Sequence, residues 1–414
     1  MLIKLFILLF EIGFGITFNV IGTISMSEVF LILGVFWYIK TDFYKKFPVL
    51  KTISLLYLGL LLSQILSELI VGNELNNSLR GYAVTIVSYL HFIFLFSFFI
   101  KNRLLIVYAL IGMLAKQLIF GTEFEGSVGE VLDGEGATFL KFYVAPIVTN
   151  GLLLISVFLP KKNIVLLFFL VGLAFIILGA RSSGLIIVIT ALITFIILFG
   201  RSKINKTGIL IISFITIFLS YGLYILYVNR VLEGSITSGN SAQLKEASNP
   251  YNPINLLVMG RTETFVGWVA FMDEPWFGHG AWAKDATGKY RMLIFKIRDT
   301  DYREIDLDVI PAHSVLIGTG MQNGIFALFF MVCILIYFLK FCPPLLNKRN
   351  KLLLLLVYFA ITIIWVFLFS PSSHFRLTIP LYFAFILASF LVQKKRIYLM
   401  RRKQKLQSIR KSAL

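Results

Sequence analysis

Charged side chains are scarce in this chain. They make up only 14% of its 414 residues, whereas 58% of the residues are hydrophobic, and a soluble domain of this size carries nearer a quarter charged residues. The apolar residues form repeated runs of about 17 to 25 residues, which is the length that crosses a bilayer core as a helix. A transmembrane β-barrel would show alternating rather than continuous apolar runs. The sequence therefore predicts an all-α polytopic integral membrane protein, organised as a single domain over residues 1–414.

Cysteine and the common catalytic motifs are also nearly absent. Cys333 and Cys342 are the only cysteines, so neither a disulfide nor a thiolate metal site has support. The sequence contains no Walker A, HExxH or GxSxG motif, which excludes the usual nucleotide, zinc-protease and α/β-hydrolase sites. The N-terminal apolar run lacks a small-x-small cleavage site, and we therefore interpret it as a first spanning helix rather than a removed signal peptide.

Acidic residues are missing from the segments that hold most of the basic ones. The N-terminus, five alternate loops and the C-terminal tail contain 25 of the 39 Lys and Arg residues but a single acid, Asp42. This asymmetry follows the positive-inside rule and places those segments on the cytoplasmic face. The net charge of +18 therefore indicates topology and contact with anionic lipids, not nucleic-acid binding.

Twelve spanning helices with both termini inside bring every basic loop to one face. The predicted helices cover residues 2–22, 27–39, 53–71, 82–100, 104–120, 139–159, 164–179, 184–199, 209–228, 312–341, 352–369 and 377–392. The basic tail over residues 393–414 is then cytoplasmic. The acidic loop Gly121–Thr138, which has no Lys or Arg, is expected outside.

One long polar interruption, residues 229–311, is predicted to be a large extracytoplasmic loop. Within it, Met259–Met272 reads as a helix with Arg261 at its start and an apolar face containing Phe265, Trp268, Val269 and Met272, which favours a position along the membrane surface. The Asp273-Glu-Pro sequence then ends this helix. His279 follows between two glycines, where a structural role is favoured over a catalytic one. The pairs Asp299/Asp301 and Asp306/Asp308 have a spacing that can hold a divalent cation, but the pattern is common in loops and we expect no metal.

Four polar residues are expected at membrane depth. Glu11, Glu68, His91 and Lys116 are candidates for function, because an unpaired charge there costs several kcal/mol. Packing or hydrogen bonding between helices explains each of them as well, and this structural interpretation is favoured.

Arginines at the outer face form a second set of candidates. Arg181 and Arg376 lie in tight turns where the positive-inside rule disfavours them, and Arg261 begins the loop helix. A guanidinium binds phosphate oxygens through a bidentate fork. Salt bridges to external acids, or contact with lipid headgroups, would also account for these positions.

His313 follows Pro311 at the predicted start of a spanning helix. The positive end of the helix dipole disfavours an imidazolium at that place. A neutral imidazole can accept a proton, as a general base must. A structural histidine is an equally good interpretation of this position on physical grounds.

Three segments, in this order, together resemble the O-antigen polymerase and O-antigen ligase superfamily of bacterial envelope glycosyltransferases. They are the Ala-Arg-Ser turn within Gly179–Gly184, the motif Gly260–Gly280 with its arginine, tryptophan-bearing helix and Pro-x-x-Gly-x-Gly turn, and the run Pro311–Phe326 that begins Pro-Ala-His-Ser. They cover under half of the chain. Ser314 stands where the family usually has asparagine.

The resemblance implies a GT-C-like fold whose large periplasmic loop carries short amphipathic helices, in a multi-pass protein of the bacterial cytoplasmic membrane. It implies inverting transfer, without metal or other cofactor, from an oligosaccharide on undecaprenyl diphosphate at the outer face. By position, Arg181 and Arg261 would bind the donor diphosphate, with Arg376 as a weaker candidate, and His313 would deprotonate the acceptor hydroxyl. A chain-length regulator and a flippase in the same membrane are the expected protein partners.

The expected activity is that of a repeat-unit polymerase for O-antigen or a capsule-like polysaccharide. The ligase, which moves finished polymer onto lipid A–core, shares the motifs and is the close alternative. A polysaccharide flippase or other transporter is the alternative from another class. Transporters usually have paired repeats, interrupted helices and midplane sites, whereas here no internal repeat is evident and the polar residues concentrate in one loop.

Overall fold

The computed structural model describes most of the chain. The described residues are 1–19, 22–35, 41–121, 139–178, 180–199, 218, 221–222, 224–234, 249–252, 261–298, 309–311 and 313–412. The predicted acidic loop apart from Gly121, most of the predicted helix over residues 209–228 and both Asp-x-Asp pairs lie outside them.

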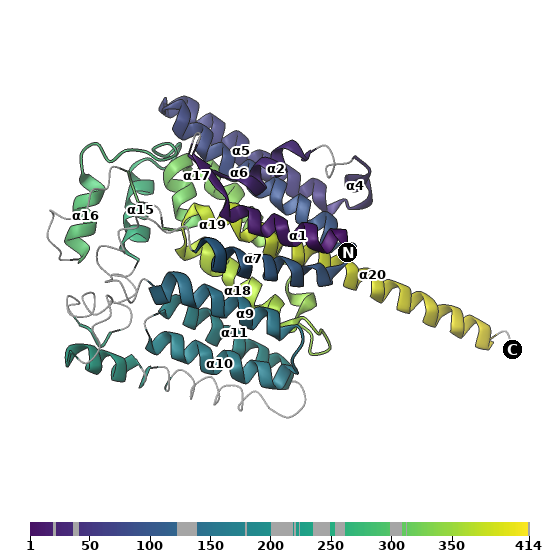
Figure 1. Cartoon of the computed structure of the whole chain (residues 1–414). Coiled ribbons are helices and arrows are strands. Elements are labelled where there is room, and N and C mark those ends of the chain that lie inside the picture. Colours follow the sequence, from purple (N-terminus) through teal and green to yellow (C-terminus); the bar gives the residue numbers. More distant parts are fainter. Residues whose placement is uncertain are drawn as a thin grey trace.

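The described chain is a bundle of helices with one small β-hairpin (Figure 1). The helices are α1 Leu2–Ile12, α2 Met26–Leu33, α4 Thr41–Lys46, α5 Val49–Val71, α6 Leu75–Phe99, α7 Ile106–Phe120, α9 Ala145–Ser156, α10 Lys161–Ile177, α11 Arg181–Phe199, α15 Thr262–Asp273, α16 Lys289–Arg298, α17 Val315–Leu339, α18 Leu353–Phe369, α19 Ser372–Leu377 and α20 Ile379–Ser412. The hairpin pairs β1 (Thr17–Asn19) with β2 (Thr23–Ser25).

Five of these helical segments are long and apolar enough to cross a membrane. They are Val49–Val71, Leu75–Phe99, Arg103–Phe120, Ser182–Phe199 and Val315–Leu345. Two shorter apolar segments, Leu140–Ser156 and Leu353–Phe369, reach the lower end of the spanning range of about 17 to 25 residues. The chain is therefore a mainly helical membrane protein, as predicted. The number of twelve crossings stays a prediction.

The predicted first span, a continuous helix over residues 2–22, is wrong. Helix α1 ends at Ile12, and a short turn over Gly13–Gly15 leads into the hairpin. Glycines weaken a helix, and a capping box formed by Ser25 and Glu28 starts the next one. With about 1.5 Å of rise per residue, α1 spans only about half of the bilayer core.

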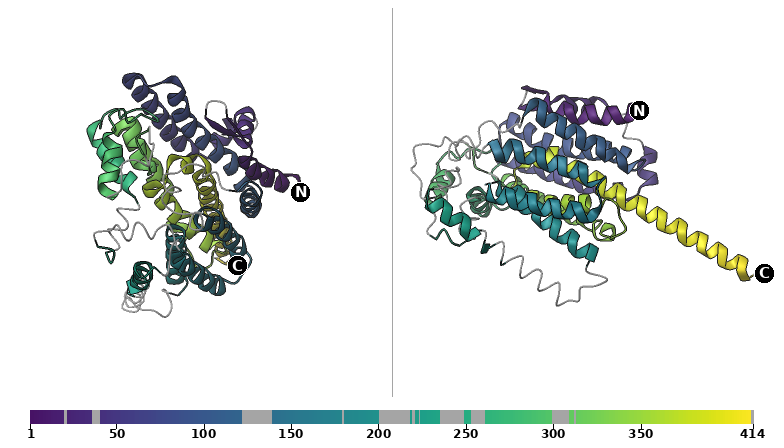
Figure 2. Two further views of the ribbon diagram at one scale, coloured as in Figure 1. Left: turned by 60° about the vertical axis from the view of Figure 1, so that its left-hand side comes forward. Right: turned by 60° about the horizontal axis from the view of Figure 1, so that its bottom comes forward.

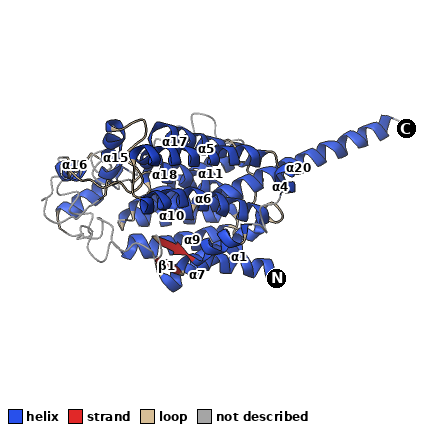
Figure 3. Cartoon of the chain, turned by 90° about the horizontal axis from the view of Figure 1, so that it is seen from above, coloured by secondary structure: helices blue, strands red, loops and turns tan. Residues whose placement is uncertain are grey.

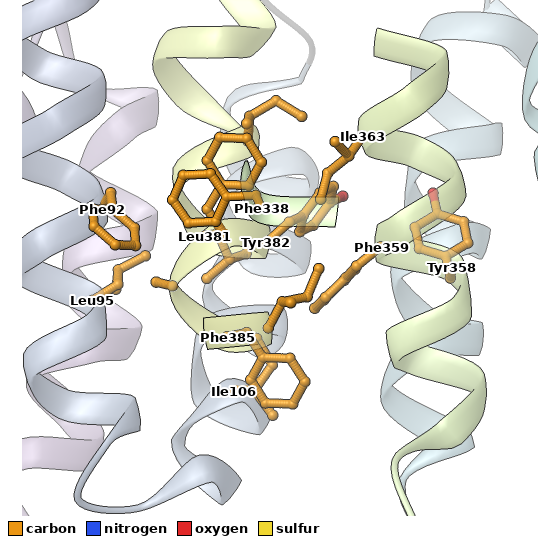
Figure 4. Close-up of a cluster of buried hydrophobic side chains, with 14 of the residues drawn as sticks. Phe92, Leu95, Ile106, Phe338, Tyr358, Phe359, Ile363, Leu381, Tyr382 and Phe385 are labelled. Atoms are coloured by element: carbon orange, nitrogen blue, oxygen red, sulfur yellow. The ribbon is translucent and has the colours of Figure 1, made fainter. Parts of the chain in front are cut away.

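The core of the bundle is built largely from aromatic rings. Figure 4 shows Phe92 of α6, Phe338 of α17 and Phe359 of α18 around the start of α20. The rings of Phe338 and Phe383 are stacked with their centroids 3.6 Å apart, and those of Phe359 and Tyr382 are 4.1 Å apart. Tight packing of this kind fixes the helices against one another, since lipid provides no hydrophobic drive between them.

The basic and the loop-bearing segments lie at opposite ends of the bundle. The N-terminus, α4 and the projecting end of α20 share one end, and α15 and α16 lie at the other (Figure 1, Figure 3). At the basic end, the Lys161 ammonium donates a hydrogen bond to the carbonyl oxygen of Lys348. The predicted basic loops before α10 and before α18 therefore lie together.

Helix α20 is longer than predicted. It continues past the expected end at residue 392 to Ser412 and leaves the bundle as a projecting rod (Figure 2). Its outer part is rich in Lys, Arg, Gln and Leu, which are good helix formers.

Helix α17 is interrupted where the loop meets it. Gly324 has φ +76° and ψ −173°, which is outside the range of a right-handed helix. The backbone groups at the break bond to the loop instead: the amides of His279 and Gly280 donate to the carbonyl oxygens of Met321 (2.9 Å) and Gln322 (2.8 Å). The amide of Ile325 likewise donates to the carbonyl oxygen of Pro275 (2.8 Å). The loop is therefore seated in the broken helix.

We expect Gly324→Ala to destabilise the folded protein by about 1–3 kcal/mol from backbone strain alone. A Cβ at this position would also overlap the carbonyl of Trp276. Gly151→Ala in α9 is the matched control, because beyond its own turn of helix no atom lies within 4 Å of its Cβ position and alanine favours a helix by up to about 1 kcal/mol. Thermal denaturation in detergent measures both. Equal midpoints for the two variants would contradict the tight seating of the loop.

Candidate functional site

The three sequence segments that carry the family resemblance meet at the starts of three helices. Arg181 is the first residue of α11, Arg261 is the N-cap of α15, and Ser314 is the N-cap of α17. Helix starts expose unpaired backbone amides. Each also carries a partial positive charge of roughly half a unit.

Arg261 joins the start of α15 to the start of α11. Its Nη2 donates a hydrogen bond to Ser182 Oγ at 3.1 Å. Its guanidinium also lies over the ring of Trp365 in α18, 5.6 Å from the centroid, which is within the range of a cation–π contact. The side chain of Arg181 lies outside the described part of the structure.

The charge of Arg261 is retained in this position. Burial lowers the pKa of Arg261 from its ordinary value, and the neighbouring Glu263 acts in the opposite direction. Arginine begins from a pKa above about 12. A half-buried guanidinium therefore stands at the junction of two helix starts.

His313 lies one residue before the N-cap of α17, which is Ser314, and the predicted position in the first turn of the helix is wrong. Ser314 takes the N-cap: its Oγ accepts a hydrogen bond from the Ile317 amide at 3.1 Å and donates one to the Phe367 carbonyl oxygen at 2.9 Å. Serine and asparagine are about equally good N-caps. This explains why Ser314 can occupy the position where the resembling family usually has asparagine.

The backbone of His313 is bound to the first turn of α15. The hydroxyl of Thr264 donates to the His313 carbonyl oxygen at 3.2 Å, one turn away from Arg261. Contacts thus run from Ser182 through Arg261 and Thr264 to His313. Together they bring the starts of α11, α15 and α17 to one place, where amide dipoles and a guanidinium favour an anion.

His374 of α19 is a neighbour of His313 that the sequence did not reveal as a site residue. Burial, together with the charges of His313 and Lys116, lowers the pKa of His374 to about 4. Its imidazole is therefore neutral at pH 7, and the nearby His313 and Lys116 both favour this neutral form. The sequence offered no signal for it beyond its place in the same tight turn as Arg376.

Arg376 is bound elsewhere. Its Nε and Nη2 both contact the carboxylate of Glu28, and Nη2 also donates to the Thr23 carbonyl oxygen at 2.9 Å. These bonds tie α19 to the hairpin and to the capping box of α2. A role of Arg376 in substrate binding stays a prediction, and its guanidinium is already occupied.

Both Glu28→Gln and Arg376→Gln are expected to lower the stability of the protein by about 3 kcal/mol. Removing one partner of a buried pair leaves the other uncompensated, and the Arg376 side chain is 20% exposed, which places the effect at the lower end of the range. Thermal denaturation measures the loss. We expect both variants to keep the turnover of the molecules that fold. Weakened substrate affinity in Arg376→Gln alone would restore Arg376 as a ligand.

The four polar residues predicted at membrane depth fall into two groups. Glu68 is fully engaged: it accepts hydrogen bonds from Asn73 (2.8 Å), Ser78 (2.9 Å) and the Ala281 amide (2.7 Å), so it anchors the loop to α5 and α6. Glu11 and His91 are buried with their side chains 4.0 Å apart. Lys116 interacts electrostatically with Glu11. The contacts of Glu68 favour the structural interpretation for that residue.

His279 packs at the end of α15. Its Nε2 donates to the Ala270 carbonyl oxygen at 2.8 Å. Nearby, Tyr290 and Lys289 both donate to Asp273, at 2.7 Å and 2.6 Å. These contacts join α15 to α16 and favour the structural interpretation of His279.

Within the described ranges, no three His, Cys, Asp or Glu side chains gather where they could hold a metal ion. Comparison of the sequence with protein-family models and with curated proteins gives no match. The residues and their geometry are therefore the basis on which a function can be assigned.

Proposed function

We propose that this protein is a glycosyltransferase that polymerises O-antigen or a capsule-like polysaccharide at the outer face of the bacterial cytoplasmic membrane. It transfers the growing glycan from undecaprenyl diphosphate to a lipid-linked repeat unit. The observation that carries the proposal is the contact chain Ser182–Arg261 and Thr264–His313. It joins three segments that are far apart in the sequence and that resemble one glycosyltransferase superfamily.

In the proposed reaction, His313 takes the proton of the acceptor sugar hydroxyl. The hydroxyl oxygen then attacks the anomeric carbon of the donor, and the bond from that carbon to the diphosphate oxygen breaks with inversion. The lipid diphosphate leaves with the electron pair. Arg261, with Arg181, stabilises the charge that grows on the leaving group, as fixed cationic donors do in a site shielded from water. Arg376 is not assigned a role, because Glu28 occupies it.

The proposed topology keeps both termini in the cytoplasm and the 229–311 loop in the periplasm. Of the twelve predicted crossings, the first is not retained as a full one, because α1 ends at Ile12. The gathering of basic segments at the end of the bundle opposite α15 and α16 supports this topology (Figure 1). A flippase and a chain-length regulator are the proposed partners in the same membrane. The ligase reaction uses the same donor and a lipid A–core acceptor, and it stays the close alternative.

A transporter is the second candidate, because α17 is interrupted at Gly324. Discontinuous helices in transporters leave backbone groups that bind substrate or ions. Here the carbonyl oxygens of Met321 and Gln322 accept bonds from loop amides, and the amide of Ile325 donates to the Pro275 carbonyl oxygen. Since the protein's own loop occupies these groups, the break favours the enzyme over the transporter.

Purified protein supplied with lipid-linked repeat units tests the proposal. A polymerase joins two or more units and releases lipid diphosphate, in the presence of a metal chelator and with no second membrane compartment. A ligase acts only when lipid A–core is added. Movement of unmodified substrate across a liposome membrane, without consumption, would assign the protein to transport.

A further inference from the structure

Helix α15 exposes an apolar stripe along its whole length. Phe265, Trp268, Val269 and Met272 recur at three- and four-residue spacing and are all exposed, with Trp268 at 48% and Met272 at 58%. None of the four carries a charge. In water, such a contiguous stripe would be a liability, and surfaces of this kind mark a site of interaction.

The opposite face of the same helix is buried in the protein. Val266, Ala270 and Phe271 are buried against Tyr290 and Ile294 of α16. The orientation of α15 is therefore fixed by packing, and the exposed stripe follows from it. The stripe cannot be buried against the bundle by rotation of α15, because the opposite face of the helix already fills that position.

The stripe continues onto the outward face of a spanning helix. Trp276, which follows α15, is 65% exposed, and its ring centroid lies 6.5 Å from that of Phe326 in α17. Further along α17, Phe329 and Ile336 are each 61% exposed. Since α17 belongs to a segment long and apolar enough to cross the membrane, these outward residues face lipid.

The orientation of α15 is also that of a helix at a lipid boundary. In Figure 1 the helices of the bundle run across the picture, whereas α15 and α16 stand upright at its end. If the bundle crosses the bilayer, α15 lies along the membrane plane. An amphipathic helix in that position buries its apolar face about 5–10 Å into the boundary between headgroups and acyl chains.

We propose that the α15 stripe and Trp276 are embedded in the lipid leaflet at the loop end of the bundle. The occupant of this surface is the bilayer boundary, where tryptophan rings are enriched at headgroup level. The inference rests on exposure and on continuity with α17, and it does not depend on the proposed transfer reaction. A second copy of the chain and the isoprenoid tail of a substrate are the competing occupants.

Spin labelling of the full-length protein in phosphatidylcholine nanodiscs tests this proposal. Cys333→Ala and Cys342→Ala remove the native thiols, and single cysteines are then placed at Trp268 and Met272 for a nitroxide label. Phe329→Cys on α17 is the control that faces lipid. Lys284→Cys is the control that faces water, since its side chain is 65% exposed. Collision with oxygen and with a water-soluble nickel complex reports the depth of each label.

We expect labels at 268 and 272 to collide more with oxygen than with nickel, at a depth between those of the two controls. Nickel collisions equal to those at residue 284 would overturn the proposal. Spin–spin broadening together with low collision rates for both oxygen and nickel would also overturn it, because this result would indicate contact with a second copy of the chain. Shielding that appears only after polyprenyl diphosphate is added would assign the surface to the substrate tail. If one variant fails to fold, Phe265→Cys provides another position on the same stripe.

Discussion

His313→Ala should lower the rate of glycan transfer by about 10²–10⁴-fold, the usual contribution of a general base. The residue lies beside the N-cap of α17, and Thr264 fixes its backbone one turn from Arg261. Without an imidazole, no group is left in the proposed mechanism to take the proton of the acceptor hydroxyl. Cells that carry the variant should make no polymer while protein level and lipid-linked monomer stay intact, which gel analysis of the polysaccharide and an immunoblot measure.

Ser314→Ala is the matched control for His313→Ala. It removes the N-cap bonds to Ile317 and Phe367, at a cost of about 1 kcal/mol in stability, but it leaves the imidazole in place. We expect Ser314→Asn to keep both stability and activity, because asparagine caps a helix equally well. Normal chain length in His313→Ala would remove His313 as the base. Equal losses of transfer activity in His313→Ala and Ser314→Ala would show that the His313 substitution acts by disturbing the start of α17, not by removing a base.

Arg261→Lys should lower turnover by about 10²-fold or more, even though the positive charge is kept. The loss of one fixed donor to a developing oxyanion has an effect of this size. Lysine cannot form the bidentate fork, and it also loses the planar group that lies over Trp365. We expect the decrease mainly in kcat, since charge grows on the leaving diphosphate as the glycosidic bond breaks.

Two controls separate this effect from general electrostatics and from packing. Lys284→Gln removes an exposed loop cation that pairs with Glu74, and surface pairs of this kind contribute at most about 1 kcal/mol. Trp365→Phe keeps a ring beneath the guanidinium and should retain most of the activity. A fully active Arg261→Lys variant would show that only the positive charge at this position matters and that no bidentate contact to the diphosphate is needed.

The apolar runs predicted the five helical segments that are long and apolar enough to cross a membrane, because hydrophobic length is a property of continuous sequence. Helix α15 begins after Arg261, three residues later than the predicted start at Met259, and it ends at Asp273, where the Asp-Glu-Pro sequence was predicted to end it. The hairpin at Thr17–Ser25 was not predicted although its signals are local: the turn over Gly13–Gly15 lies inside the apolar run predicted as one helix over residues 2–22, and the capping box of Ser25 and Glu28 follows that run.

Features that depend on distant contacts could not be predicted. The break in α17 arises where Gly324 meets the backbone of Trp276. The Asn323-Gly324 dipeptide is a local turn signal, but the segment that binds to the break is about 45 residues away in the sequence. Arg376 is paired with Glu28, which lies near the other end of the chain. The position of His374 near His313 likewise follows from how the short helix α19 is packed. The sequence motifs predicted a site that contains Arg261 and His313. Arg261 is hydrogen-bonded to Ser182, and Thr264, one turn further along α15, is hydrogen-bonded to the backbone of His313; a substrate site there stays a prediction.

The binding of undecaprenyl diphosphate to the purified protein tests the central claim most directly. The lipid without sugar carries the diphosphate that Arg261 is proposed to hold, and it offers no hydroxyl for His313 to deprotonate. We expect the wild type and His313→Ala to bind it equally, and Arg261→Lys to bind it at least about tenfold more weakly, a difference of about 1.4 kcal/mol. Equal affinity in the wild type and Arg261→Lys would contradict a diphosphate site at the meeting point of α11, α15 and α17.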